Sequence, residues 1–151
     1  FRPIIETIYH ADRIFVYGTG MVQRTVAKEM KRLFYHGRKN FFDFNGGDEF
    51  RALLKELNNR DLLIMISVSG ERESLLEFVQ KAKIKNVPVI SITERLKNPL
   101  AQLSDYNLYI STTAVEQNLS SVQYKSMTSY FILVEMLMLR YLEYLEEKEE
   151  L

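Results

Sequence analysis

Five short apolar runs, separated by segments of helical periodicity, limit what this chain can fold into more than any other feature. Each run is rich in β-branched or aromatic residues and is bounded by turn residues, as expected for a buried strand. Several are nearly all apolar rather than alternating, which is typical of strands covered on both faces in a parallel sheet. The predicted strands are residues 13–17 (RIFVY), 40–44 (NFFDF), 62–66 (LLIMI), 87–92 (VPVISI) and 107–110 (NLYI).

The segments between the strands carry apolar residues at helical spacing. Residues 22–35, 49–57 and 75–82 each place one apolar stripe along a predicted helix. Pro99 starts a short fourth helix, where its missing N–H donor does no harm. This alternation predicts right-handed crossovers and an open, doubly wound α/β sheet. With 151 residues the chain can form one such domain but not two ordinary ones.

The C-terminal part departs from this alternation. Residues 120–147 show a pattern that predicts one long helix, followed by a solvated end. The middle of this helix is apolar around much of its circumference, which indicates burial against the sheet. Two interpretations stay open: the helix also contacts a partner subunit, or it packs only within its own chain.

The composition excludes several kinds of function. Twenty basic and twenty acidic residues cancel, so no net charge attracts nucleic acid or an anionic membrane. There is no cysteine, and His10 and His36 lie far apart without metal-ligand spacing, so we expect no disulfide and no metal site. No apolar run reaches the roughly 18 residues of a membrane span and no signal peptide is visible, so we expect a cytoplasmic protein. Because the chain begins at Phe1 rather than at methionine, we also expect a domain cut from a longer protein.

Ligands of open α/β sheets bind beyond the carboxyl ends of the strands, near the point where the strand order reverses. The loop after the first predicted strand is Gly18-Thr19-Gly20. A dinucleotide fingerprint would require glycine again at position 23, where this chain has Gln23, so the motif is a weak sign of nicotinamide binding. The alternative is that both glycines allow a tight turn and close helix packing.

The loop after the third predicted strand, Ser67-Val68-Ser69-Gly70, favours an anion. A loop between a buried strand and a helix directs backbone N–H groups and the helix dipole at a ligand, a combination that binds phosphate. Both serine hydroxyls could reach one oxyanion, and Gly70 would let the backbone approach closely. Arg72 could add a charge-assisted contact. The alternative is that the serines only cap the next helix.

Together these motifs resemble a known family. The ordered set of GTG, S-x-S-G-E, VPVISIT and NPLAQLSDYNLYI is similar to that of a sugar isomerase (SIS) domain, and it extends from Phe1 to about Glu147. The polar loop that ends in two serines and the long helix most resemble the effector domain of RpiR-type bacterial transcription regulators. In those regulators an N-terminal helix-turn-helix domain precedes the SIS domain, which would explain why this chain lacks a basic face.

The resemblance implies a flavodoxin-like, three-layer α-β-α fold with a five-stranded parallel sheet, and a phosphosugar ligand near a dimer interface. It implies that Ser67, Ser69 and Gly70 hold the phosphate, and that the loop after Gly20 and the loop before the last helix close on the sugar. Two positions depart from the family pattern, since Val22 and Arg72 stand where the family has hydroxyl residues. The candidate phosphosugar-binding residues are Gly18, Thr19, Gly20, Ser67, Ser69, Gly70, Arg72, Glu116, Ser120 and Ser121.

Three functions stay open. The favoured one is a sensor for carbohydrate metabolism that binds a phosphosugar and has no catalytic residue and no cofactor. Ligand binding would change the geometry of a homodimer or a dimer of dimers, and through it the activity of an attached DNA-binding domain. A free-standing sugar-phosphate isomerase would need a base poised near neutral pH, and the strand-end loops offer Glu71, Glu94 and Glu116 but no histidine. The third is a domain that has lost ligand binding and serves only for dimerisation, as Val22 and Arg72 suggest.

Overall fold

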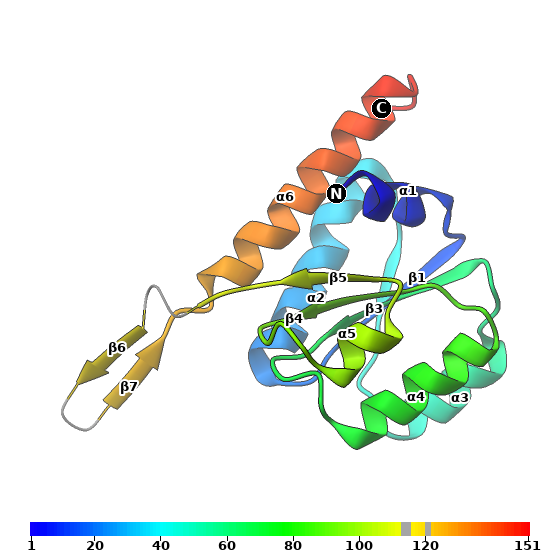
Figure 1. Ribbon diagram of the computed structural model, residues 1–151. Helices are drawn as coiled ribbons and strands as arrows, with labels where there is room; N and C mark the ends of the chain where they lie inside the picture. Colours follow the sequence, from blue (N-terminus) through cyan, green and yellow to red (C-terminus); the bar gives the residue numbers. More distant parts are fainter. Residues whose placement is uncertain (113–115, 120–121) are drawn as a thin grey trace.

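A parallel sheet of five strands runs through the middle of the domain (Figure 1). The computed structural model describes residues 1–112, 116–119 and 122–151. The strand order is β2-β1-β3-β4-β5 and each neighbouring pair is parallel, which confirms the expected flavodoxin-like sheet. The strands are β1 (Arg13–Gly18), β2 (Phe41–Asp43), β3 (Asp61–Ile66), β4 (Val89–Thr93) and β5 (Tyr106–Tyr109).

Helices cover both faces of the sheet and complete the predicted α-β-α layers (Figure 1). One buried cluster joins the sheet to α1, α2 and α6, and a second joins it to α3, α4 and α5. Among the described residues, no helix is both long and apolar enough to cross a membrane. The helices are α1 (Arg2–His10), α2 (Met21–Phe34), α3 (Asp48–Glu56), α4 (Glu73–Ile84), α5 (Pro99–Leu103) and α6 (Thr128–Glu147), with a 3-10 turn at Tyr35–Gly37.

The central strand β3 explains why the predicted strands are so apolar. All its residues are buried. Leu62, Ile64 and Ile66 belong to the cluster shared with α1, α2 and α6, whereas Leu63 and Met65 belong to the cluster shared with α3, α4 and α5. Because successive side chains of a strand point to opposite faces, a strand covered on both faces needs apolar residues at consecutive positions.

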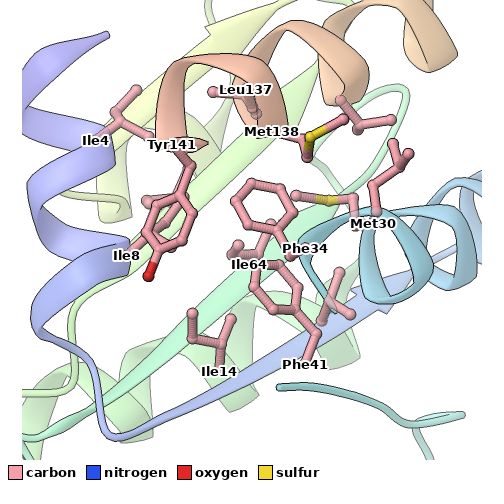
Figure 2. Packing of buried hydrophobic residues seen from close by; sticks show 14 of the residues in the cluster. Ile4, Ile8, Ile14, Met30, Phe34, Phe41, Ile64, Leu137, Met138 and Tyr141 are labelled. Carbon is pink, nitrogen blue, oxygen red and sulfur yellow. The ribbon is translucent and has the colours of Figure 1, made fainter. Parts of the chain in front are cut away.

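Aromatic side chains fill the space between α2, α6 and the sheet (Figure 2). Phe34 of α2 stacks on Phe41 of β2, with ring centroids 4.6 Å apart. Tyr141 of α6 lies beside Phe34, at 5.5 Å between centroids. Contacts of this kind bind α6 to the body of the domain through buried side chains.

The strand order reverses between β1 and β3. From β1 the chain crosses outward to β2, and it then returns to place β3 on the other side of β1. The loops that follow β1 and β3 therefore lie side by side at the carboxyl edge of the sheet, where the N–H of Thr19 donates to the carbonyl oxygen of Ile66 at 3.0 Å. This edge is the place where open α/β sheets bind ligands.

The C-terminal helix begins later than predicted. We expected a helix over residues 120–147, but α6 starts at Thr128 and an antiparallel hairpin precedes it, made of β6 (Glu116–Leu119) and β7 (Val122–Lys125). In Figure 1 the hairpin projects away from the sheet. The prediction was wrong because the stretch VQYK was assigned to the helical stripe, although it alternates apolar and polar residues with the period of a strand.

Candidate functional site

The loops that follow β1, β3 and β4 are joined by backbone hydrogen bonds at the carboxyl edge of the sheet. Beyond the contact between the first two loops, the N–H of Ser67 donates to the carbonyl oxygen of Ile92, and the N–H of Glu94 donates to that of Val68, both at 3.0 Å. The motifs at residues 18–20 and 67–70 are thus brought together with the end of β4, as a single ligand site requires.

The two serines of the loop after β3 hold the loop in shape. The Oγ of Ser67 accepts the N–H of Gly70 at 3.0 Å, and the Oγ of Ser69 accepts the N–H of Glu71 at 3.3 Å. The first residue of α4 is Glu73 and its N-cap forms no side-chain cap hydrogen bond, so neither serine caps this helix. A hydroxyl that accepts one bond still has its own hydrogen to donate. Both hydroxyls are therefore fixed in place with a hydrogen left to donate, Ser69 from a half-buried position and Ser67 from a buried one, 2% exposed.

Gly70 could not be replaced by another residue without a collision. Its φ is +66°, a left-handed conformation that favours glycine, and a Cβ there would lie 2.0 Å from Oδ1 of Asn98. The buried Asn98 side chain is fixed in turn: its Nδ2 donates to Oγ1 of Thr93 at 3.1 Å and to the Arg95 carbonyl at 2.8 Å. Its Oδ1 accepts the N–H of Ala101 at 2.8 Å. Sequence reasoning placed Asn98 only at a helix start and missed its contact with the loop of residues 67–70.

The loop of residues 18–20 brings the start of α2 close to β1. A Cβ on Gly18 would lie 2.2 Å from the backbone carbon of Gln23, so this position requires glycine for close packing. Gly20 is the N-cap of α2. In the described part of the chain, the half-buried Thr19 hydroxyl makes no hydrogen bond to another residue. A ligand that reached this loop could therefore take the hydroxyl of Thr19 as a further donor.

Two exposed arginines, Arg72 and Arg95, lie in the loops after β3 and β4 and differ in their ion pairing. Arg95 forms an ion pair with Glu71 at 3.1 Å, and both side chains are more than half exposed, so the pair adds little stability. Arg72, the N-cap of α4, is exposed and pairs with no residue in the part of the chain that the structure describes. Arg72 comes two positions after Gly70 in the chain, and a guanidinium can form bidentate bonds to a phosphate.

Glu94 forms a network of hydrogen bonds next to the loop of residues 67–70. Its Oε1 accepts from Nζ of Lys125 at 2.6 Å and from Oγ1 of Thr112 at 3.0 Å, and its Oε2 accepts from the hydroxyl of Tyr130 at 2.6 Å. The Glu94 side chain is only 7% exposed. Sequence reasoning treated Glu94 as a candidate base. It did not predict the three hydrogen-bond partners, because they lie 18 or more positions later in the chain.

The surroundings of Glu94 keep it ionised. Burial acts to raise the pKa of its carboxyl, but the hydrogen bonds from Lys125, Tyr130 and Thr112 outweigh burial and lower that pKa below its ordinary value. Burial in turn raises the pKa of Tyr130 above its usual range, and the bond to Glu94 raises it further. The network therefore holds a carboxylate at Glu94 and a neutral phenol at Tyr130 at neutral pH.

Three candidate residues lie in or near the hairpin. Glu116 begins β6 and is paired with Lys125 of β7 in the ladder. Ser120 and Ser121 lie outside the described residues. The two histidines lie elsewhere: Nδ1 of His36 is 2.9 Å from the carbonyl oxygen of Leu33, in the turn after α2, and His10 ends α1. Among the described residues, no group of three His, Cys, Asp or Glu side chains could hold a metal ion.

The structure is an α/β domain with a loop of serine and glycine residues, Ser67 to Gly70, at the point where the strand order reverses. Residues 7–140 match the family model of the SIS domain. Because this match covers most of the chain, the protein belongs to the SIS domain family, as the motifs indicated.

The similarity extends to regulators. The HTH-type transcriptional regulator GlvR of Bacillus subtilis (strain 168) is 32% identical over 144 residues, which are 95% of this chain and 56% of that protein. The Vibrio vulnificus NanR protein complexed with ManNAc-6P superposes with a TM-score of 0.82 at 22% identity, over 99% of this chain and 55% of that one. The sugar isomerase domain of an RpiR transcription factor from Sphaerobacter thermophilus superposes with a TM-score of 0.77 at 22% identity, over 99% and 85% of the two chains.

This chain spans only about half the length of GlvR. Shorter matches join it to two sugar-phosphate isomerases, a phosphoheptose isomerase of Cytophaga hutchinsonii and a 3-hexulose-6-phosphate isomerase of Methylomonas aminofaciens, over 57% and 30% of this chain. The regulator match is longer than either enzyme match, so the comparisons favour a regulator over an enzyme.

Proposed function

We propose that this SIS domain is the effector-sensing domain of a bacterial transcription regulator and that its effector is a phosphosugar. The observation that carries the proposal is the loop of residues 67–70, where two serine hydroxyls are fixed by backbone N–H groups and keep their own hydrogens for a ligand. The match to GlvR over 95% of this chain supports the regulatory role, and the ManNAc-6P bound to NanR supports the class of ligand.

The chemistry of the loop suits a phosphate dianion. The hydroxyls of Ser67 and Ser69 donate to its oxygens, and the N-terminal end of α4 contributes a partial positive charge. Gly70 allows the left-handed turn that packs this loop against Asn98, Thr19 adds a donor from the neighbouring loop, and Arg72 supplies a positive charge two positions after Gly70 in the chain. With Gly18 and Gly20 shaping the first loop, these residues form the phosphate half of the proposed site.

The sugar half of the proposed site comes from the segment before α6. Glu116 would accept hydrogen bonds from sugar hydroxyls, and Ser120 and Ser121 would contribute further polar contacts. The ion pair between Lys125 and Glu94 supports this placement, because it holds the end of the hairpin against the end of β4, next to the phosphate loop.

An isomerase is the second candidate function, because parts of the chain are similar to two sugar-phosphate isomerases. It would need a base with a pKa near neutral pH. Glu94 does not suit this role, since three donors hold its carboxylate and its pKa lies below its ordinary value. Glu71 is exposed and paired with Arg95, which leaves Glu116. Incubation with hexose and pentose phosphates, followed by NMR, would support the isomerase by showing interconversion and reject it by showing none.

The regulatory role requires a route to DNA and a second subunit. The chain carries no net charge, so in this proposal the DNA contact is made by a separate upstream helix-turn-helix domain, and the regulator works in the cytoplasm. Outward-facing apolar residues of α6 supply a surface for a homodimer or a dimer of dimers: Ile132, Met136 and Leu139 are 52%, 41% and 50% exposed. A domain that only dimerises would keep this surface and bind no phosphosugar.

A thermal-shift screen tests the proposal. A ligand at about 100 times its Kd stabilises the native state by about 2.7 kcal/mol, which raises the Tm of a domain of this size by about 5–10 °C. We expect a shift of this size with at least one sugar phosphate, and none with the same sugar lacking phosphate. If a broad panel of hexose, pentose and amino-sugar phosphates leaves the Tm unchanged, the domain is not a phosphosugar sensor.

A further inference from the structure

Glu94 forms hydrogen bonds to four separate segments of the chain. Its N–H donates to the carbonyl oxygen of Val68 in the phosphate loop. Its carboxylate accepts from Thr112 after β5, from Lys125 at the end of β7 and from Tyr130 in the first turn of α6. A single residue thus connects the loop that would bind the phosphate to the hairpin and to the long C-terminal helix.

We infer that Glu94 is a positioning residue that makes the phosphate loop, the hairpin β6–β7 and the start of α6 move as one unit. Its role is to carry a change at residues 67–70 to the C-terminal helix, without itself touching the ligand. The ligand-dependent part of this inference rests on the proposed function, whereas the mechanical connection does not.

The hydrogen bonds of Glu94 are hard to break because its side chain is buried. A carboxylate that is 7% exposed has little water to replace a lost donor, so moving away from Lys125 or Tyr130 leaves a buried charge with one donor fewer. By contrast, the ion pair between Glu71 and Arg95 also joins the loops after β3 and β4, but it is more than half exposed and water can replace it.

Both ends of the connection are anchored in the structure. Tyr130 is fully buried and belongs to the same apolar cluster as Val134 and Leu137 of α6, so a shift of its hydroxyl moves the helix rather than a free side chain. On the hairpin, Tyr124 is 56% exposed and Lys125 reaches inward to Glu94. Among the described side chains of the hairpin, Lys125 is therefore the one that ties it to the sheet.

Hydrogen–deuterium exchange of the ligand-free protein tests the mechanical part. Exchange would be compared in the wild type, in Glu94→Gln and in a matched control, Glu71→Gln, which makes the same chemical change in the exposed ion pair. We expect Glu94→Gln to speed amide exchange over residues 116–130 by about tenfold, and to leave β3 unchanged. Glu71→Gln should leave both segments unchanged. Equal exchange over residues 116–130 in the two variants would overturn the inference.

A second variant covers the case in which Glu94→Gln does not fold. Lys125→Gln removes the hairpin end of the connection while Tyr130 and Thr112 still satisfy the buried carboxylate. We expect faster exchange in the hairpin, with α4 and β3 as slow as in the wild type. Unchanged exchange in the hairpin of Lys125→Gln would show that this lysine does not hold it.

Exchange in the presence of ligand tests the transmission. With the sugar phosphate that raises the Tm, the wild type should be protected at residues 67–72 and also at residues 126–130, which lie beyond the hairpin residues proposed to contact the sugar and include Tyr130. Glu94→Gln should be protected at residues 67–72 but not at residues 126–130. Protection of both segments in Glu94→Gln would refute the transmission. If no sugar phosphate binds the wild type, the proposed function fails, and the ligand-free comparison still decides whether Glu94 ties the segments together.

Discussion

Replacing Gly70 by alanine tests the geometry of the phosphate loop most sharply. A new Cβ would meet Oδ1 of Asn98 at 2.0 Å, and Gly70 has a φ of +66°. The left-handed conformation costs a non-glycine residue about 1–2 kcal/mol. Displacing Asn98 loosens three hydrogen bonds, to Thr93, Arg95 and Ala101, each contributing about 0.5–1.5 kcal/mol. Together these costs destabilise Gly70→Ala by about 3–6 kcal/mol, a large part of the usual stability of about 5–15 kcal/mol.

Gly47→Ala is the matched control for the backbone cost. Gly47 has a φ of +59°, but a Cβ added there would have nothing within 4 Å. The reduced freedom of the unfolded chain is the same for both alanine variants and cancels between them. Gly47 has a ψ of −125°, which also strains an alanine, so we expect Gly47→Ala to lose about 1–3 kcal/mol from the backbone alone. A larger loss in Gly70→Ala then reports the collision with Asn98.

Urea unfolding followed by far-UV circular dichroism measures both variants. In the double variant Gly70→Ala/Asn98→Ala the atoms that collide at 2.0 and 2.6 Å are gone and only the Cβ contact at 3.1 Å remains. Its destabilisation should therefore fall short of the sum of the single effects by about 1–2 kcal/mol. The reasoning is refuted if Gly70→Ala is no less stable than Gly47→Ala, or if the two single effects simply add.

Three further predictions concern the site. Ser69→Ala should weaken binding of the sugar phosphate about tenfold, as expected for one lost hydrogen bond to a charged group. The Tm of the free protein should change little, because the bond from the N–H of Glu71 is exposed and water can replace it. Calorimetric titration showing equal Kd values would contradict this prediction. Tyr130→Phe leaves Oε2 of the buried Glu94 without its donor and should cost about 1–3 kcal/mol in urea unfolding. Because the pKa of Glu94 is lowered in the folded state, its ionised form stabilises the fold above its ordinary pKa of 4.5, and this stabilisation is lost as the pH falls. The stability gap between the wild type and Glu94→Gln should therefore be widest near pH 7 and narrow on acidification, and a gap that is constant with pH would exclude this linkage.

Much of the fold could be predicted because the spacing of apolar residues along each segment matches the faces that the segment buries. The run LLIMI is apolar throughout because β3 is covered on both faces, and the helices between the strands each show one apolar stripe. The strand order could not be derived from periodicity, since any order buries the same residues. It followed from the resemblance to SIS domains, which the parallel order β2-β1-β3-β4-β5 confirms.

The candidate site could be predicted only in part. The loops around Thr19 and Ser67 were identified because each follows a buried strand, and the sheet topology brings them together. The role of Glu94 could not be foreseen, because its partner Lys125 is 31 positions away. The hairpin was not predicted either. Its strands β6 and β7 are short and pair with each other rather than with the sheet, so neither shows the apolar run of a core strand.

Amide chemical shifts test the central claim most directly, namely that the loop of residues 67–70 is the phosphate site. In ¹⁵N-labelled protein titrated with a stabilising sugar phosphate, the account predicts that the largest shifts fall on the loops after β1 and β3, including Thr19 and Gly70. The same sugar without phosphate should leave these amides in place. The claim would be contradicted if the shifts gathered instead around Arg2 and Arg140, in the hollow of about 350 Å³ between α1 and α6.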